Sequence, residues 1–373
     1  MCELGALLLS RQKLAPSRKC SWVQKTLDAL GFFRDENLTL LTSIGTPNWE
    51  LPLVAAVLDR VNVNIVVCAE NDCSFQQITG RIYSDFNLSN NSSFTHFPIS
   101  TSKKSYMHIR DQYIMDSADI LFPVSIRTKG FMEKSLQKNH LSKKTDCRFL
   151  LHEKKRTKDS VFKSFSDIVL NNPFLISSDH LVHWTRTSLH PWPDESAFDF
   201  YKDIIKSQNY PRSAFHALFN ILSSQTVYAS NRHMAKNIYT VCLSGNSPTE
   251  FFKLMRWRKR YVQMAFEPYG IGIEKNTALS LGIRPVIYTD PQKTRKLNYS
   301  ERWMYQSSGK SGNWLEENEY RYRGNLSLKE IPKDKLIAYC LYPCEADFLR
   351  NRFGIKTIPF SRFNPESMSE EHQ

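Results

Sequence analysis

The sequence has no uninterrupted apolar run long enough to form a membrane-spanning helix. Its first ten residues hold only three consecutive leucines and no basic segment before them, which is unlike a secretory signal. No internal repeat is apparent either. Together these absences predict a cytoplasmic protein that does not act at a membrane.

The cysteines are equally uninformative about a metal. There are eight, scattered along the chain, and no two pairs have the spacing of zinc ligands. Cys68 and Cys242 lie inside apolar runs, as buried thiols do. We therefore predict reduced thiols and no metal site.

What the sequence has in excess is positive charge. Lys and Arg number 50 against 37 Asp and Glu, which gives a formal net charge of +13. Such a balance favours polyanionic partners such as nucleic acid, or phosphate-bearing ligands, although solvated lysines alone can also produce it. With 373 residues, of which 41% are hydrophobic, the chain is long enough for two packed domains.

Residues 1–136 are predicted to form an α/β domain with an open, mostly parallel sheet. Apolar runs at residues 38–42 and 61–68 flank a helical pattern at residues 49–59, which is the spacing of a βαβ unit. A further strand is expected at residues 119–126.

Ligands of such sheets bind at the carboxyl ends of the strands. Two predicted strands end at Ser43–Pro47 and at Ser125–Gly130. We therefore expect a ligand site near these two segments.

The segment from Ile109 to Gly130 carries a pattern of its own. An arginine and an acidic residue open a helix, a small residue and an aspartate end it, and a strand and a turn follow. The residues at these positions are Arg110, Asp111, Ala118, Asp119, Arg127 and Gly130. Over roughly a third of the chain, the N-terminal half thus resembles the Rossmannoid superfamily of DNA-processing protein A and the LOG-type nucleotide phosphoribohydrolases.

This resemblance implies a site for nucleotides, modified nucleotides or nucleic acid, since a helix N-terminus and its arginine attract phosphate. The implied nucleotide-binding residues are Ser43, Gly45, Arg110, Asp111, Arg127 and Gly130. The chain lacks the multi-glycine first loop, and no glutamate is clearly placed for hydrolysis, so we expect ligand sensing rather than catalysis in this domain. The alternative is that Arg110 and Asp111 only cap and charge a surface helix.

The rest of the chain differs in character. Residues 137–165 are rich in Lys and Arg and are interpreted as a basic connector. Residues 166–363 carry many short strand-like patterns and predict an α+β domain, in which residues 249–263 are expected to form a strongly basic helix. A disordered tail is expected at residues 364–373.

The second domain is predicted to contain an acidic strand at Trp314–Arg321. Glu317 and Glu319 are two residues apart, so on a strand both carboxylates would share one face. Like charges placed together are costly unless a cation answers them. Arg321 and Arg323 could supply that cation, and the sequence leaves open whether the glutamates face these arginines or a ligand.

Three parts of this domain resemble the arrangement of ADP-ribosyltransferases: His183 with Arg186, then Ser230, then Glu319 preceded by Glu317. The resemblance implies NAD as the bound nucleotide and the two glutamates as catalytic carboxylates, which would stabilise an oxocarbenium-like centre as nicotinamide leaves. The implied substrate-binding residues are His183, Arg186, Ser230, Arg232 and Tyr269. The acidic segment also resembles uncharacterised bacterial domains with a Trp-x-x-Glu-x-Glu-aromatic-Arg strand, which imply no established activity.

Three functions are consistent with these patterns. The first is a nucleotide-sensing domain fused to a domain that processes NAD or another nucleotide, in the style of bacterial conflict or phage defence. The second is a DNA- or RNA-binding protein without enzymatic activity, which uses the basic connector and the basic helix. The third is a regulatory or assembly component that binds a ligand without chemistry.

Overall fold

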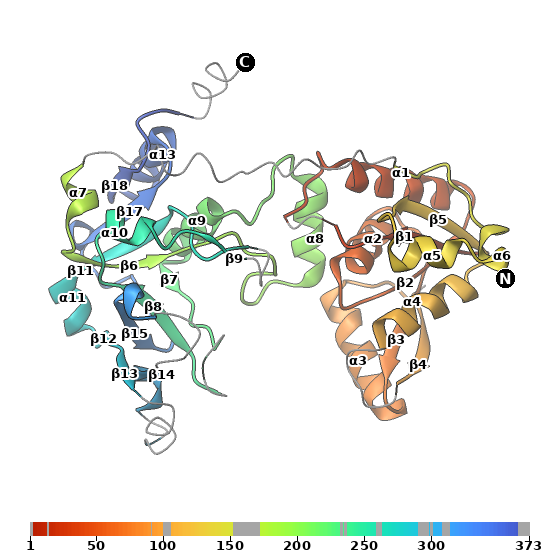
Figure 1. Cartoon of the computed structure of the whole chain (residues 1–373), viewed down its shortest axis with the longest axis horizontal. Helices are drawn as coiled ribbons and strands as arrows, with labels where there is room; N and C mark the ends of the chain where they lie inside the picture. Colours follow the sequence, from red (N-terminus) through yellow and green to blue (C-terminus); the bar gives the residue numbers. More distant parts are fainter. Residues whose placement is uncertain are drawn as a thin grey trace. The chain divides into compact units, whose positions relative to one another are not determined.

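The computed structural model describes residues 3–12, 15–90, 92–99, 106–151, 172–231, 234, 237–258, 263–289, 298, 301–307 and 314–364. The chain forms two compact units, namely Met1–Asp159 with Leu189–Pro211, and Ser160–Ser188 with Arg212–Gln373 (Figure 1). Among the helices in the described ranges, none has both the length and the apolar character needed to cross a bilayer.

The first unit is built on a parallel sheet of five strands. The strands are β1 (Leu4–Leu9), β2 (Thr39–Ser43), β3 (Val63–Ala69), β4 (Ser93–Pro98) and β5 (Ile120–Ser125). Their order in the sheet is β4-β3-β2-β1-β5, and every neighbouring pair is parallel. This confirms the predicted Rossmann-like α/β architecture.

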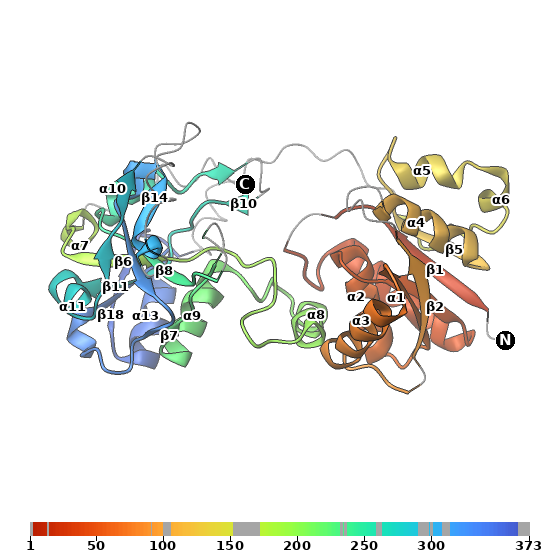
Figure 2. The ribbon, with the colours of Figure 1, turned by 90° about the horizontal axis from the view of Figure 1, so that it is seen from below.

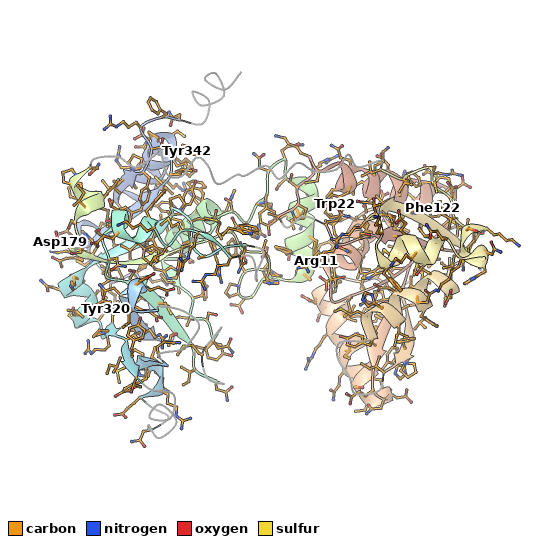
Figure 3. The ribbon with its side chains drawn as sticks, in the orientation of Figure 1. Arg11, Trp22, Phe122, Asp179, Tyr320 and Tyr342 are labelled. Atoms are coloured by element: carbon orange, nitrogen blue, oxygen red, sulfur yellow. The ribbon has the colours of Figure 1, made fainter. Side chains whose placement is uncertain are left out.

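Helices cover both faces of this sheet, as parallel sheets require. They are α1 (Ser21–Asp35), α2 (Pro47–Leu58), α3 (Asp72–Asp85), α4 (Tyr106–Ser117), α5 (Phe131–Leu136), α6 (Asn139–Ser142) and α8 (Ala197–Lys206). One core contains Trp22 of α1 and Phe122 of β5 together with residues of α2 and α8 (Figure 3). The other core contains Leu8 of β1 with Ile114 of α4, and Figure 2 shows α4 and α5 on the side of the sheet away from α1 and α2.

Two features of this unit differ from the pattern-based boundaries. The described part of the expected connector, up to Leu151, packs on the sheet: Leu141 is fully buried, and the amide of Leu151 donates to the carbonyl of Val124 at 2.8 Å. Helix α8, expected in the second domain, belongs to the first unit, because its apolar side (Phe198, Tyr201, Ile204 and Ile205) joins the first unit's core. Residues 152–165 of the connector lie outside the described residues.

The second unit is built on a mixed sheet of seven strands, confirming the predicted α+β class. The strands are β6 (His180–Trp184), β8 (Thr240–Ser244), β11 (Gly270–Glu274), β12 (Arg284–Pro285), β15 (Glu319–Arg323), β17 (Leu336–Cys340) and β18 (Lys356–Pro359). Their order is β12-β15-β8-β6-β11-β17-β18, antiparallel except for the β17–β18 pair.

Shorter elements complete this unit. The helices are α7 (Pro173–Ile176), α9 (Ala214–Ser224), α10 (Pro248–Phe252), α11 (Lys275–Ser280) and α13 (Pro343–Phe353), and the 3₁₀ turns are η1 (Arg302–Met304), η2 (Trp314–Glu317) and η3 (Lys333–Lys335). Three two-stranded pairs join β7 (Thr226–Val227) to β16 (Leu326–Ser327), β9 (Trp257–Arg258) to β10 (Gln263–Met264), and β13 (Ile287–Thr289) to β14 (Tyr305–Ser307). One core cluster runs through the unit, from Leu218 of α9 to Leu349 of α13.

Two predictions for this unit are wrong. The basic helix expected at residues 249–263 stops at Phe252, and the chain continues into the antiparallel strands β9 and β10. The acidic segment is not one strand: Glu317 ends the turn η2, and Asn318 has a φ of +43° before β15 begins at Glu319. The alternation that places both carboxylates on one face of a strand therefore does not apply. The expected disordered tail lies outside the described residues after Asn364.

Gly5 of β1 offers a test of the first unit's packing. A Cβ added there would lie 2.5 Å from the ring of Phe33, a fully buried and rigid neighbour. We expect Gly5→Ala to lower the free energy of unfolding by about 1–3 kcal/mol. Gly80→Ala is the matched control, because Gly80 lies in α3 with nothing within 4 Å of the added carbon. It should raise stability by about 0.5–1 kcal/mol. Urea unfolding distinguishes the two outcomes.

Candidate functional site

The first unit has a topological switch point at β1. From β1 the chain builds β2, β3 and β4 toward one edge of the sheet, and it then returns to place β5 on the other side of β1. The chain therefore leaves β1 and β5 toward opposite faces of the sheet, and their carboxyl ends mark the switch-point crevice where open α/β sheets bind ligands. The sequence pattern points to the β5 end but not to β1, since the short run Leu4–Leu9 gives no strand boundary of its own.

Hydrogen bonds join the ends of β1 and β5 at this crevice. The amide of Ser10 donates to the carbonyl of Ser125 at 2.8 Å, and the amide of Arg127 donates to Oγ of Ser10 at 2.8 Å. The Arg127 guanidinium donates to the carbonyl of Arg11 at 3.3 Å. Arg11, Arg127 and Lys129 are all exposed here. The crevice thus presents three cationic side chains on a backbone frame held by Ser10.

Gly130 has a structural task in this crevice. Its amide donates to the carbonyl of Arg127 at 3.0 Å, and it precedes the first residue of α5. An added Cβ would lie 2.9 Å from that same carbonyl oxygen. Lys129 before it has a φ of +61°. Gly130 therefore shapes the turn that carries Arg127.

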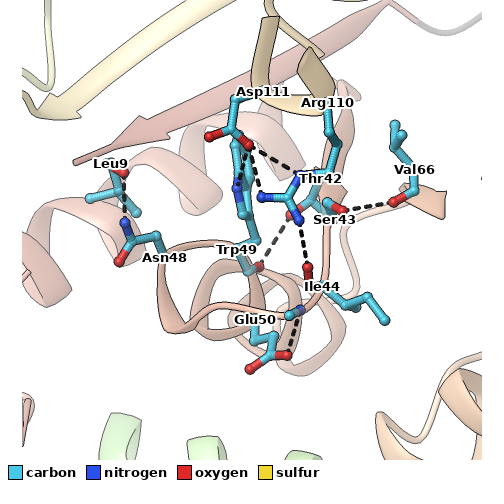
Figure 4. Close-up of polar contacts among 11 residues, drawn as sticks. Leu9, Thr42, Ser43, Ile44, Asn48, Trp49, Glu50, Val66, Arg110 and Asp111 are labelled. Carbon is cyan, nitrogen blue, oxygen red and sulfur yellow. Dashed lines mark hydrogen bonds and ion pairs between the residues drawn. The ribbon is translucent and has the colours of Figure 1, made fainter. Parts of the chain in front are cut away.

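Arg110 and Asp111 act inside the protein rather than on its surface. Arg110 is 3% exposed, and its guanidinium donates to the carbonyl of Ile44 at 2.7 Å and to Oδ1 of Asp111 at 2.8 Å (Figure 4). The same Oδ1 accepts from the indole of Trp49 at 3.2 Å. The surface-cap alternative is therefore wrong, and both residues brace the turn between β2 and α2.

Ser43 and Gly45 are likewise engaged within the protein. Ser43 is 1% exposed and donates through Oγ to the carbonyl of Val66 at 2.7 Å. Gly45 has a φ of +92°, a conformation that favours glycine, and its amide donates to Oε1 of Glu50 at 2.8 Å. Of the six predicted nucleotide-binding residues, only Arg127 presents an exposed charged side chain.

The acidic segment of the second unit contains a saturated ion pair. Arg321 Nε and a terminal nitrogen donate to the two carboxylate oxygens of Glu319 at 2.8 and 2.9 Å. The terminal nitrogens also donate to the carbonyls of Trp303 and Tyr305, both at 3.1 Å, and to Oε1 of Gln306 at 2.7 Å. All five N–H donors of the guanidinium are used. Glu319 therefore faces Arg321, one of the two alternatives that the sequence left open.

Glu317 is held differently. Its side chain is 19% exposed, and its Oε1 lies 3.4 Å from a guanidinium nitrogen of Arg258. Burial raises the pKa of Glu317 above its usual value, with the nearby Glu319 charge adding to the effect and Arg258 opposing it. The same surroundings raise the pKa of Tyr288 to about 12, chiefly through burial and then through Glu319. Of the two glutamates, Glu317 is thus the one whose buried negative charge is only partly offset by a nearby cation.

His183 fills a gap between two strands of the sheet. Strands β6 and β8 share one register pair, Val182 with Ser244, whereas β8 and β15 share five. Nδ1 of His183 donates to the carbonyl of Cys242 at 2.8 Å, which leaves Nε2 as the unprotonated ring nitrogen. Desolvation lowers the pKa of His183, so the ring is neutral at physiological pH.

Cys242 does not behave as the buried core thiol that the apolar run predicts. Its neighbours Val241 and Leu243 enter the core, so the alternation of β8 turns Cys242 to the other face, where it is exposed. Cys242 is the register partner of Arg321. Although the residue as a whole is exposed on that face, neighbouring groups desolvate the thiol, and this desolvation, followed by the charge of Glu319, raises the pKa of Cys242 to about 12. The thiol is therefore a poor nucleophile at neutral pH.

The remaining predicted substrate-binding residues do not form one group. Tyr269 is 8% exposed in the core and donates to Oε1 of Glu345 at 3.0 Å. Ser230 is exposed and pairs by its backbone with Thr240. Arg186 is half-buried just beyond β6. Arg232 lies outside the described residues. Of the described set, the structure gathers the two glutamates, and it joins His183 to them only through the backbone of β8.

No protein-family model matches this chain, and no curated protein matches its sequence. Among the described residues, no group of three or more His, Cys, Asp or Glu side chains is placed to hold a metal ion. The geometry of the two units is therefore what any functional conclusion depends on.

The saturated ion pair makes a clear prediction about stability. Arg321→Leu leaves the Glu319 carboxylate buried without a counter-charge and releases the carbonyls of Trp303 and Tyr305. We expect it to lower the free energy of unfolding by about 3–5 kcal/mol. Arg323→Leu, two residues along the same strand at an exposed position, should change it by less than about 0.5 kcal/mol. Equal effects of the two substitutions in thermal unfolding would contradict the structural role of Arg321.

Proposed function

We propose that this chain is a cytoplasmic, nucleotide-responsive protein in which the first unit binds a phosphate-bearing nucleotide and the second processes NAD or a related nucleotide. The observation that carries the proposal is the cationic switch-point crevice of the first unit. Arg11, Arg127 and Lys129 lie at the carboxyl ends of β1 and β5, where Rossmann-like sheets bind ligands. A role in bacterial conflict or phage defence fits a sensor joined to a nucleotide-consuming unit.

The chemistry of the crevice favours phosphate over a neutral ligand. Guanidinium groups form paired, charge-assisted hydrogen bonds to phosphate oxygens. The carbonyl of Arg11 already accepts one N–H of Arg127, which orients that guanidinium along the crevice. Binding without hydrolysis is the expected role of this unit, because the residues at its strand ends brace turns rather than offer a catalytic carboxylate.

The crevice proposal is tested by charge removal. Arg11→Gln and Arg127→Gln should each weaken the binding of ADP about tenfold, the loss expected for one charge-assisted hydrogen bond. Arg81→Gln is the matched control, since Arg81 is an exposed arginine of α3, whose C-terminal end lies away from the carboxyl ends of the strands. Isothermal titration measures all three variants. Equal affinities for the two crevice variants and the control would contradict the proposed site.

In the second unit, Glu317 supports the proposed chemistry better than Glu319. Both oxygens of Glu319 are taken by Arg321, whereas the Glu317 carboxylate has, among the described residues, a single ion pair at 3.4 Å, and its pKa is raised. A carboxyl with a raised pKa holds its proton more readily than an ordinary glutamate, as a general acid must. The proposal keeps the resemblance of His183, Ser230, Glu317 and Glu319 to the ADP-ribosyltransferase arrangement and assigns Glu319 a structural role.

Glu317→Gln separates catalysis from stability. Its activity toward NAD should fall at least about 100-fold, because the group that moves the proton is lost. Its stability should rise at about pH 8. The raised pKa means that the folded state favours the protonated carboxyl, so the stability of the wild type falls as the pH rises past the unfolded pKa of about 4.3, and the full cost is reached above the folded pKa. This gain should vanish below about pH 4, where wild-type Glu317 is protonated in both states.

Glu319→Gln is the matched comparison for that experiment. It removes the charge that answers Arg321 and should destabilise the protein. Unchanged NAD turnover in Glu317→Gln, or no turnover of NAD or another dinucleotide by the wild type, would contradict the catalytic half of the proposal and leave a ligand-binding regulatory protein.

A nucleic-acid partner is the second candidate. Arg256 and Trp257 are exposed side by side at the start of β9, Trp257 to 43%, and such a pair can contact phosphate and stack on a base. Lys259 and Tyr261, which the sequence places beside them, lie outside the described residues. A single-stranded oligonucleotide that binds at low salt and outcompetes ADP would favour this candidate.

A further inference from the structure

Glu50 of α2 bridges two parts of the first unit that are far apart in the sequence. Its Oε1 accepts from the amide of Gly45 at 2.8 Å, in the turn between β2 and α2 (Figure 4). Its Oε2 accepts from the hydroxyl of Tyr201, in α8, at 2.6 Å. One carboxylate therefore holds the turn and the helix at once.

Hydrogen bonds hold α8 to the first unit at its start, in its middle and just after its end. The amide of Ala197 at its start donates to Asp85 at 2.8 Å, Tyr201 in its middle donates to Glu50, and the carbonyl of Ser207 just after it accepts from the amide of Arg18 at 3.0 Å. Tyr201 is 4% exposed, so its hydroxyl has no ready access to water if Glu50 withdraws. An unsatisfied buried hydroxyl is costly, which makes the position of Glu50 and the order of α8 interdependent.

The chain around α8 connects this contact to the second unit. The chain leaves the second unit after Ser188 and rejoins it at Arg212, and the excursion between them, Leu189–Pro211, belongs to the first unit. The amide of Ser188 donates to the carbonyl of Arg212 at 2.8 Å, which closes the base of the excursion within the second unit. The excursion thus belongs to the first unit, and the residues on either side of it belong to the second.

The turn that Glu50 holds is joined to the proposed ligand crevice. The side chain of Asn48, in the first turn of α2, donates to the carbonyl of Leu9, the last residue of β1, at 2.9 Å (Figure 4). The start of a 12-residue helix carries a partial positive charge that an anion can satisfy. In this structure the anion that meets the Gly45 amide is the protein's own Glu50.

We propose that the β2–α2 turn and α8 form one coupled element, in which Glu50 bonds both Gly45 and Tyr201 and a phosphate group entering the turn displaces it from both. This inference rests on the proposed nucleotide site and adds its regulation. The phosphate repels the Glu50 carboxylate and takes its place at the turn. Tyr201 then loses its acceptor and α8 loosens. Ligand binding and α8 docking therefore oppose each other, and by linkage each weakens the other by the same factor.

Tyr201→Phe tests the coupling because it keeps the buried ring and removes only the hydroxyl. Hydrogen exchange followed by mass spectrometry compares the peptides that cover residues 43–50 and 197–206. Without any ligand, exchange in the turn should rise about tenfold in Tyr201→Phe, since Glu50 loses the contact that fixes it. With ADP bound, exchange in α8 should rise in the wild type and stay unchanged in the variant. ADP should bind the variant about three- to tenfold more tightly, because freeing Glu50 no longer strands a hydroxyl.

The matched control is Tyr83→Phe. It removes a tyrosine hydroxyl from α3 of the same unit, where the acceptor is the carbonyl of Ser92 at 3.3 Å, and it should change neither the turn nor ADP affinity. Turn exchange within twofold of the wild type in Tyr201→Phe would overturn the coupling whatever the ligand. If the wild type binds no ADP but turn exchange still rises in Tyr201→Phe, the coupled element stands and the proposed nucleotide site fails.

Discussion

A buried guanidinium organises each of the two units. Arg110 in the first and Arg321 in the second are both 3% exposed, and each has a carboxylate partner close in the sequence together with backbone carbonyls. Burying such a charge is expensive unless hydrogen bonds and a counter-charge answer it. Once answered, the planar group fixes several chain segments in one geometry: Arg110 holds the turn that carries Gly45, and Arg321 holds the chain from Trp303 to Gln306 against β15.

This constraint explains why the sequence predicted the fold better than the sites. Apolar periodicity is a local signal, and it correctly predicted the mostly parallel sheet of the first unit and the α+β class of the second. The ion pairs, in contrast, depend on contacts with residues that are far away in the sequence. The spacing of Glu319 and Arg321 is compatible with a pair or with a ligand site, and the deciding contacts come from Gln306, fifteen residues away. The same holds for Arg110, whose acceptor at Ile44 is 66 residues away.

Two other sequence predictions differ from the structure for other reasons. The predicted helix at residues 249–263 extends a good local pattern past Phe252, but the chain turns there so that Trp257 and Arg258 can pair with Gln263 and Met264. Helix α8 has an apolar side, yet its sequence does not say which core receives that side. Only the packing of Phe198 and Tyr201 in the first unit assigns it. Hydrophobic periodicity shows which side of a helix is buried, but it does not show which distant part of the chain that side packs against.

The two glutamates of the second unit differ in the same respect: one is part of a structural ion pair, and the other is the proposed catalytic carboxyl. A carboxylate whose two oxygens both accept from a saturated arginine is held in one place by the structure around it. Its neighbour Glu317, with one long contact to Arg258 and a pKa raised by burial, carries a cost that the fold does not offset. Departures from good local energetics are expected where a protein acts on something else.

Glu50 in the first unit has two roles within a single side chain, because one of its oxygens secures the turn beside the crevice while the other secures α8. Because a single carboxylate bonds both the Gly45 amide and the Tyr201 hydroxyl, moving it away from one of them also disturbs its bond to the other.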